Sequence, residues 1–252
     1  MILRIFPALF ICFSTFTTIN AQSFGFGCLG FVGGYGGFSY QEYKAEGLNN
    51  YINVFNDIRS DSLVSPMESF SKAQGYRVGL NFFRAKVENF VLTTKGYYQS
   101  ISEKHEALEK FAAGTSSTTM KLEIRNWGIG VDLGISLTKW MSWKVVDGAV
   151  HFNNITFTNT SNPTGGNTKI MKYRNASANL GYSIGTGFIL EIIDEYFSIE
   201  GSAGYTKIDV DNLQMDDGTL LTENETTEDL MSDFINAGGF SAVIQLNVGF
   251  PL

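Results

Sequence analysis

Apolar and polar residues alternate along several long stretches of this chain. From Trp127 to Leu137 the odd positions are all apolar, while the even positions carry glycine, aspartate or serine. The same two-residue period recurs in residues 178–190, 197–205 and 240–250, and more weakly in 33–43, 76–82, 90–101 and 146–152. Because side chains i and i+2 of a strand share a face, the pattern predicts about eight β-strands of roughly ten to fifteen residues.

The segments between these strands are alternately long and short. The long ones are residues 44–73, 102–118, 159–172 and 209–236, and the short ones lie near 86–89, 138–141 and 191–195. Long external loops, short periplasmic turns, an even strand count and an apolar outward face are typical of transmembrane barrels. A lipocalin-like barrel, with its apolar face around a ligand, is disfavoured because the other face holds Gly, Ser, Asn and charged residues. We therefore predict an all-β fold, a closed antiparallel transmembrane β-barrel.

Aromatic residues near the ends of the predicted strands fit the interfacial girdles of such a barrel. They are Tyr97, Tyr98, Trp140, Trp143, Tyr196, Phe197 and Tyr205. No run of 18 apolar residues follows the first 21 residues, so no transmembrane helix is predicted there.

In strand pattern and loop rhythm the chain resembles the small eight-stranded outer-membrane barrels, such as the OmpA membrane domain and OmpX. Its most family-like segment is the closing strand at residues 240–250. In that family an aromatic residue at the end of the last strand is read by the barrel-assembly machinery; here Phe250 would serve, although Pro251 and Leu252 follow it. Members of the family adhere, anchor or act as lipid enzymes, so the resemblance implies an architecture rather than one function.

Residues 1–21 have the composition of a cleavable export signal. Arg4 precedes a short apolar run, and Ala21 supplies a small residue at the cut. We expect residues 22–252 to form the barrel domain in the outer membrane of a Gram-negative-type envelope. Cleavage would remove Cys12 and leave Cys28 as the only cysteine, so no disulfide within the mature chain is expected.

The charge of the chain is acidic overall and unevenly spread. The net charge is −7 with a pI near 4.9, which argues against nucleic acid as a partner and against recognition of anionic lipids. Residues 207–236 hold nine acidic residues against Lys207 alone. Four of these acids are candidate ligands for a cation such as Ca²⁺, without EF-hand spacing, or contacts for a basic protein partner: Asp209, Asp211, Asp216 and Asp217. A solvated acidic loop that keeps the surface hydrophilic is the third interpretation.

Charged residues also fall on the face predicted to line the lumen. They are Arg77, Lys95, Asp132, Asp147 and Glu200. A turn centred near residues 139 and 140 would make Asp132 and Asp147 cross-strand neighbours, so we expect Arg77 or Lys95 beside them, or one shared proton. Such a network would plug the barrel.

Two loop segments show helical periodicity, and neither histidine belongs to a catalytic motif. Leu48, Tyr51, Ile52, Phe55 and Ile58 predict an amphipathic helix over the barrel mouth, and residues 224–234 predict a second helix. His105 is expected in a solvated loop, and His151 has no serine and acid suitably spaced around it. No cofactor is predicted.

The sequence thus predicts a non-enzymatic surface or structural protein that works through its external loops, as an accessory of an envelope complex. A small-solute pore is the alternative, disfavoured because eight strands enclose a space that side chains fill. A lipid-modifying barrel enzyme is disfavoured by the missing triad. The partners expected are outer-membrane lipid, the barrel-assembly machinery, and a protein or cation at the acidic loop.

Overall fold

The computed structural model describes residues 22–24, 33–193, 196–224 and 228–249. The predicted export signal, Cys28 and Phe250 lie outside these ranges. Within them, no helix has both the length and the apolarity required to cross a bilayer.

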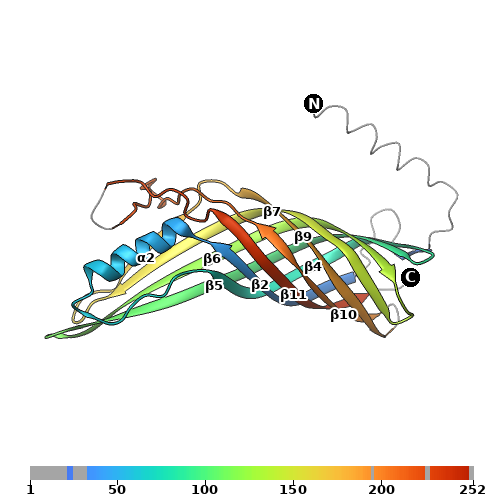
Figure 1. The fold of residues 1–252 in the computed structure, drawn as a ribbon, viewed down its shortest axis with the longest axis horizontal. Helices are drawn as coiled ribbons and strands as arrows, with labels where there is room; N and C mark the ends of the chain where they lie inside the picture. The colour runs from blue at the N-terminus through green and yellow to red at the C-terminus, as the bar shows by residue number, and fades with distance from the viewer. Residues whose placement is uncertain (1–21, 25–32, 194–195, 225–227, 250–252) are drawn as a thin grey trace, which may run out of the picture.

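Eight long antiparallel strands form a closed ring (Figure 1). In ring order they are β2 (Gly33–Lys44), β4 (Lys72–Val87), β5 (Phe90–Phe111), β6 (Gly114–Ser136), β7 (Met141–Asn162), β9 (Asn179–Ile193), β10 (Phe197–Lys207) and β11 (Ala237–Gly249). The ring closes because β2 pairs with β11 on one side and with β4 on the other, while β4 also pairs with β5. The closed eight-stranded antiparallel barrel predicted from the alternation is confirmed.

The outer wall of the barrel is apolar and exposed. Ile129 is 70% exposed, Leu180 66% and Ile244 58%. An apolar belt of this kind is stable when lipid rather than water surrounds it. Of the predicted girdle residues, Tyr98 lies on this wall beside Trp127, whereas Tyr97 is buried inside the barrel, so its assignment to a girdle was wrong.

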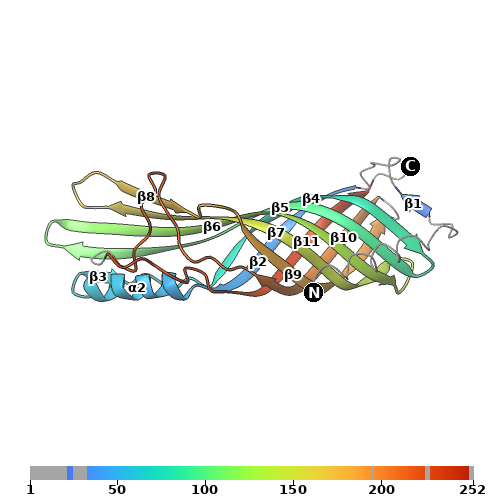
Figure 2. The same ribbon diagram turned by 90° about the horizontal axis from the view of Figure 1, so that it is seen from above.

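Strands β5, β6 and β7 run far beyond the rest of the barrel, to 22, 23 and 22 residues (Figure 2). The predicted loop 102–118 is therefore wrong, because all but residues 112 and 113 belong to β5 and β6. The predicted loop 159–172 is wrong in part: residues 159–162 continue β7, 163–168 form a connection, and 169–172 belong to a further strand. The many serines and threonines in these segments are typical of loops, but threonine is also a strong strand former. We call residues 101–111, 114–125 and 154–162 the extension; β3 (Leu63–Ser65) pairs with its β5 edge and β8 (Lys169–Arg174) with its β7 edge.

A helix and a long irregular segment cover one face of the extension (Figures 1 and 2). We call α2 (Glu46–Ile58) together with residues 208–236 the cap. The helix predicted at this position is confirmed, with Leu48, Ile52 and Phe55 buried, although Ile58 is 53% exposed. The second predicted helix is wrong: in its place Thr222 and Leu230 form an isolated antiparallel bridge, and residues 225–227 lie outside the described chain.

The remaining short strand, β1 (Gln22–Phe24), pairs with the end of β4. The connections β4–β5, β6–β7 and β9–β10 are short and lie at the barrel end opposite the cap. Of the connections that the structure describes, the two that lead out of β2 and out of β10 are long and lie at the cap end.

Candidate functional site

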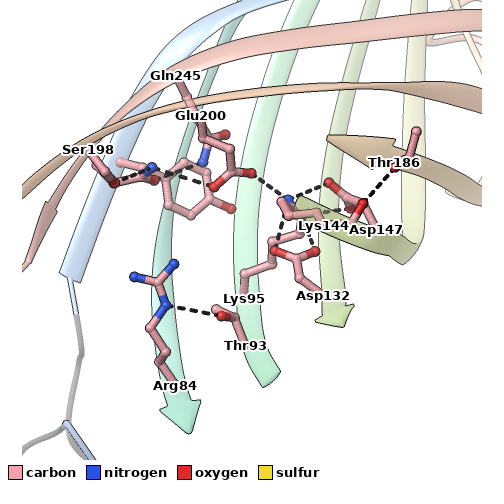
Figure 3. A network of polar contacts seen from close by, with 12 residues as sticks. Arg84, Thr93, Lys95, Asp132, Lys144, Asp147, Thr186, Ser198, Glu200 and Gln245 are labelled. Carbon is pink, nitrogen blue, oxygen red and sulfur yellow. Dashed lines mark hydrogen bonds and ion pairs between the residues drawn. The ribbon is translucent and has the colours of Figure 1, made fainter. Parts of the chain in front are cut away.

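The lumen of the barrel contains a compact cluster of ionic side chains (Figure 3). Lys95 Nζ lies 2.8 Å from Asp132 Oδ1 and 2.7 Å from Asp147 Oδ1. Lys144 Nζ lies 3.0 Å from Asp132 Oδ2, 2.7 Å from Asp147 Oδ2 and 2.5 Å from Glu200 Oε1. Two ammonium groups thus face three carboxylates, and every one of these side chains is buried. We call these five residues the lumen cluster.

The pairing of Asp132 with Asp147 follows the parity of the strands. The two residues are direct cross-strand neighbours on β6 and β7, as the turn argument predicts. A pair of buried carboxylates is unfavourable unless cations lie between them, and Lys95 and Lys144 supply these.

Lys144 was missed by the sequence reasoning because a β-bulge changes the parity of β7. The register between β7 and β9 shifts between Lys144 and Asp147. Because of this bulge, both Lys144, an even position, and Asp147, an odd position, face the lumen. In the sequence, the two consecutive apolar residues Val145 and Val146 interrupt the alternation, and this interruption could have indicated the bulge.

Arg77 does not belong to the lumen cluster. Its Nε and Nη2 donate to Gln99 Oε1 at 2.9 and 2.6 Å, and its guanidinium lies 4.2 Å from the ring centroid of Tyr97. Ser39 donates to the same Gln99 oxygen at 2.7 Å. The outer part of the lumen is therefore held by amides and one guanidinium rather than by ion pairs.

The carboxylates of the lumen cluster are of a type that binds divalent cations. Asp132, Asp147 and Glu200 offer oxygen atoms that all lie within 4.8 Å of one another. The ammonium groups of Lys95 and Lys144 already occupy the space among these oxygens. The arrangement is therefore satisfied by the chain's own cations.

Above the lumen cluster the polarity of the three long strands inverts within one row of residues. On the inner face, a polar row in direct register, Gln99, Asn126 and Asn153, is followed by an apolar row, also in direct register, of Ile101, Ile124 and Ile155. On the outer face the order is reversed: the aromatic row Tyr98, Trp127 and Phe152 is followed by Ser100, Arg125 and Asn154. Below this level the apolar outer face is exposed, and above it the cap contacts the inner face.

The core between extension and cap is that of a water-soluble domain. It contains 24 buried apolar residues of the described chain. Phe157 of β7 lies at its centre, with its ring centroid 5.8 Å from Phe234, 6.4 Å from Tyr51 and 6.5 Å from Phe70 and from Tyr173. Because α2 and residues 208–236 share this core, the cap is a packed structure rather than a set of independent loops.

A buried carboxylate holds the segment that leads from α2 back into β4. Glu103 accepts hydrogen bonds from the backbone N–H groups of Ser71 and Lys72 at 3.0 and 2.8 Å, and from the Tyr43 hydroxyl. Burial raises the pKa of Tyr43 far above its usual range, and the adjacent Glu103 raises it further, so the hydroxyl stays protonated as a donor. His105 Nε2 lies 2.8 Å from the same carboxylate, on strand β5 and against Phe70, so its predicted position in a solvated loop is wrong.

The four candidate acids of the long loop are spread over the cap surface. Asp209 lies 3.6 Å from Lys207, Asp216 lies 3.6 Å from Arg174, and Asp217 accepts a hydrogen bond from the Thr219 backbone. Among the described residues, neither these nor Asp211 belong to a group of three ligand atoms close enough to share an ion. Their arrangement offers a broad negative surface rather than a preformed cage.

His151 lies buried in the lumen, where its Nδ1 is 3.0 Å from Asn153 Oδ1. This polar partner belongs to the amide row just below the inversion. The surroundings give the histidine a packing role.

The fold and the polarity of its two surfaces define a small eight-stranded barrel of the outer-membrane type. No protein-family model matches the sequence, and no curated protein matches it. Among solved structures, the chain is similar to Ail, the attachment invasion locus protein of Yersinia pestis, with 8% identity and a TM-score of 0.40 over 86% of this chain and 97% of Ail. The structure of Ail in complex with the heparin analogue sucrose octasulfate matches with the same identity and coverage and a TM-score of 0.38.

Proposed function

We propose that this protein is an exported outer-membrane protein that presents the cap outside the cell for contact with other macromolecules. Residues 1–21 would direct export, residues 22–252 would form the membrane domain, and the last strand would be read by the assembly machinery. The single observation that carries the proposal is the polarity inversion, which leaves a folded, apolar-cored cap beyond the lipid-facing belt. A barrel whose only role was to anchor itself would not need such a core.

The partner class we propose for the cap is a basic protein surface. The acids at residues 209, 211, 216 and 217 support this, because they are spread over the surface of the cap. Opposite charge speeds association and selects partners even where it adds little affinity. A Ca²⁺ ion at these acids has less support, since their carboxylates are not gathered into a ligand set.

A solute pore has less support than a surface role. The ion pairs of Lys95 with Asp147 and of Lys144 with Glu200 join strands that are not neighbours in the ring, β5 to β7 and β7 to β10, inside the lumen. A lipid-modifying enzyme has little support too, since His105 and His151 contact a structural carboxylate and an amide.

Photo-cross-linking on intact cells tests the proposal. A photoreactive residue at Asp217, on the exposed cap, should give protein adducts, and one at Lys139, in a turn at the opposite end, should not give the same adducts. Changing Asp209, Asp211 and Asp216 to Asn should remove the Asp217 adducts while the protein still shifts on gels after heating, as a folded barrel does. Adducts of one kind at both positions, or a steady conductance of the purified protein in planar bilayers, would contradict the proposal.

A further inference from the structure

The face of the extension that points away from the cap is basic and mostly polar, with Leu108 and Ile170 as exposed apolar residues. Six basic residues lie on it against two acidic ones. The basic residues are Lys104, Lys110, Lys121, Arg125, Lys172 and Arg174, and the acidic ones are Glu106 and Glu123. Arg174 lies at the edge of this face, where it is also 3.6 Å from Asp216 of the cap. We call this surface the basic face.

Three of the lysines form one row across the sheet. Lys104 of β5 is paired directly with Lys121 of β6, which is paired with Thr158 of β7, which is paired with Lys172 of β8. Like charges directly opposite one another on a sheet are destabilising. In the described part of the chain Lys121 has an acidic neighbour, Glu123 at 3.2 Å, whereas Lys104 and Lys172 make no ion pair. The row thus carries more positive charge than its own surroundings neutralise.

The basic face begins directly above the lipid-facing belt. On β6, Arg125 lies two residues beyond Trp127, and Lys121 lies six residues beyond it. At about 3.3 Å per residue, these positions are roughly 7 and 20 Å along the strand from the aromatic row. Strand tilt reduces the heights above the membrane further. The lysine row therefore lies beyond the glycerol level of an ordinary phospholipid, at the depth of a large saccharide headgroup.

We propose that the basic face binds the phosphate groups of glycolipids in the surrounding outer leaflet. Arg125 would meet the phosphates nearest the acyl chains, and the row of Lys104, Lys121 and Lys172 would meet those further out. Threonine and serine hydroxyls between the charges would donate hydrogen bonds to sugar and phosphate oxygens. This inference rests on the outer-membrane location in the proposed function and deepens it by naming the lipid class that the extension contacts.

The overall charge of the chain conceals this face. A net charge of −7 argued against anionic lipid as a partner, but nine of the 25 acidic residues belong to the segment 207–236, and of these Asp216 alone pairs with a residue of the basic face, Arg174 at its edge, among the described residues. The binding of a ligand depends on the local field rather than on the sum over the chain. The attraction that we propose is confined to this one face, although the net charge of the chain predicts none.

The test uses the full mature chain in phosphatidylcholine nanodiscs, with bound glycolipid counted by native mass spectrometry. The probe is a bisphosphorylated glucosamine-disaccharide lipid bearing phosphorylated core sugars. We expect the triple variant Lys104→Gln, Lys121→Gln, Lys172→Gln to bind it at least about tenfold more weakly, since each surface lysine contributes to anionic-lipid attraction. Added salt should weaken binding to the unchanged chain and have less effect on the variant.

Two further variants separate the basic face from total charge. Lys44→Gln, Lys139→Gln and Lys207→Gln together remove the same charge elsewhere, at two exposed sites and one partly exposed site, and binding should not change. Glu106→Gln with Glu123→Gln removes the two acids of the face, and binding should become tighter. Heat-modifiable migration of every variant in phosphatidylcholine alone shows that the barrel is folded, so failure of this inference is distinguishable from failure of the barrel proposal.

Several results would overturn the inference. One is equal weakening by the two lysine triples. Another is equal binding of phosphatidylglycerol, whose phosphate lies too deep to reach the lysine row. A third is binding of a soluble sulfated oligosaccharide as tightly as the glycolipid, which would make the face a receptor for free polyanions. A fourth concerns dimers of the chain in the native mass spectrum. If the triple variant Lys104→Gln, Lys121→Gln, Lys172→Gln loses such dimers and still binds the glycolipid, the face is a contact for the acidic cap of a second copy.

Discussion

The two halves of strands β5, β6 and β7 are packed by opposite rules. In the barrel half the inner face carries Lys95, Asp132 and Asp147, and the outer face is apolar. In the extension the inner face carries Ile124 and Phe157, and the outer face is polar. The backbone pairing continues through this inversion of polarity. The medium on each side of the sheet therefore determines which residues each face holds, and secondary structure does not. Lipid outside requires polar or small side chains inside, whereas water outside allows an apolar core.

The lumen half is expected to be the more sensitive to loss of one charge. Lys144→Ala removes the cation that contacts Asp132, Asp147 and Glu200, leaving three buried carboxylates with Lys95 alone. We predict a loss of about 3–5 kcal/mol in the free energy of unfolding, measured by urea titration in lipid bilayers. Lys139→Ala, at an exposed turn lysine, is the matched control and should unfold like the unchanged chain. Equal midpoints for the two variants would mean that the lumen cluster is hydrated and contributes little.

The cap half is expected to be most sensitive to loss of an aromatic side chain. Phe157→Ala opens a cavity among Tyr51, Phe70 and Phe234 and should cost about 3 kcal/mol. Because this core lies outside the belt, the cap should become sensitive to protease while the barrel keeps its heat-modifiable band. Phe152→Ala, on the lipid-facing wall of the same strand, should leave the cap resistant. Loss of the heat-modifiable band in Phe157→Ala would show that cap and barrel unfold as one unit.

The segment between α2 and β4 depends on Glu103. Glu103→Gln weakens the acceptor of the Ser71 and Lys72 N–H groups and of the Tyr43 hydroxyl. A loss of about 2 kcal/mol is expected, since hydrogen bonds to a charged group are stronger than neutral ones. Hydrogen exchange should then speed up at residues 66–72 before it does in α2. Unchanged exchange in residues 66–72 would count against the anchoring role.

The smallest effect expected is a pH dependence on the basic face. Partial burial would raise the pKa of Glu123, but Lys121 and Arg125 outweigh it and hold the pKa below its usual range. A lowered carboxylate pKa contributes stability that is present above the unfolded value, near pH 4.5, and is lost as the pH falls through the folded value. Solvent screening limits this contribution to about 0.5 kcal/mol or less. The melting temperature should differ slightly less between pH 6 and pH 3.5 in Glu123→Gln than in the unchanged chain. An identical difference in both chains would show that Glu123 does not contribute to the pH dependence.

How much of this arrangement the sequence predicts depends on whether alternation is unbroken. The belt could be predicted because Trp127 to Leu133 alternate without interruption. The extension was missed because the apolar positions change parity between Ile124 and Trp127 while the strand continues, and a parity change is usually read as a strand end. Lys144 was missed for the same kind of reason, since a bulge shifts parity within β7.

The basic face could not be predicted from strand pattern alone. It depends on the register that sets Lys104, Lys121 and Lys172 in one row, and on the cap that places the acids on the opposite side. Both are tertiary features, since residues far apart in the sequence determine them. The net charge is a sum over the whole chain, so it does not show that the basic and the acidic residues gather on different surfaces.

Cysteine accessibility along β6 tests the polarity inversion most directly. In a Cys28→Ser background of the protein in bilayers, single cysteines would replace residues 119 to 131 in turn, and each would be treated with a membrane-impermeant maleimide. We predict labelling at the odd positions 119, 121, 123 and 125, and protection at the odd positions 127, 129 and 131. The even positions 120, 122 and 124 should be protected by the cap and become labelled in Phe157→Ala. Labelling of 129 and 131, or protection of 121 and 123, would show that the membrane boundary does not lie between Arg125 and Trp127 and would contradict the account.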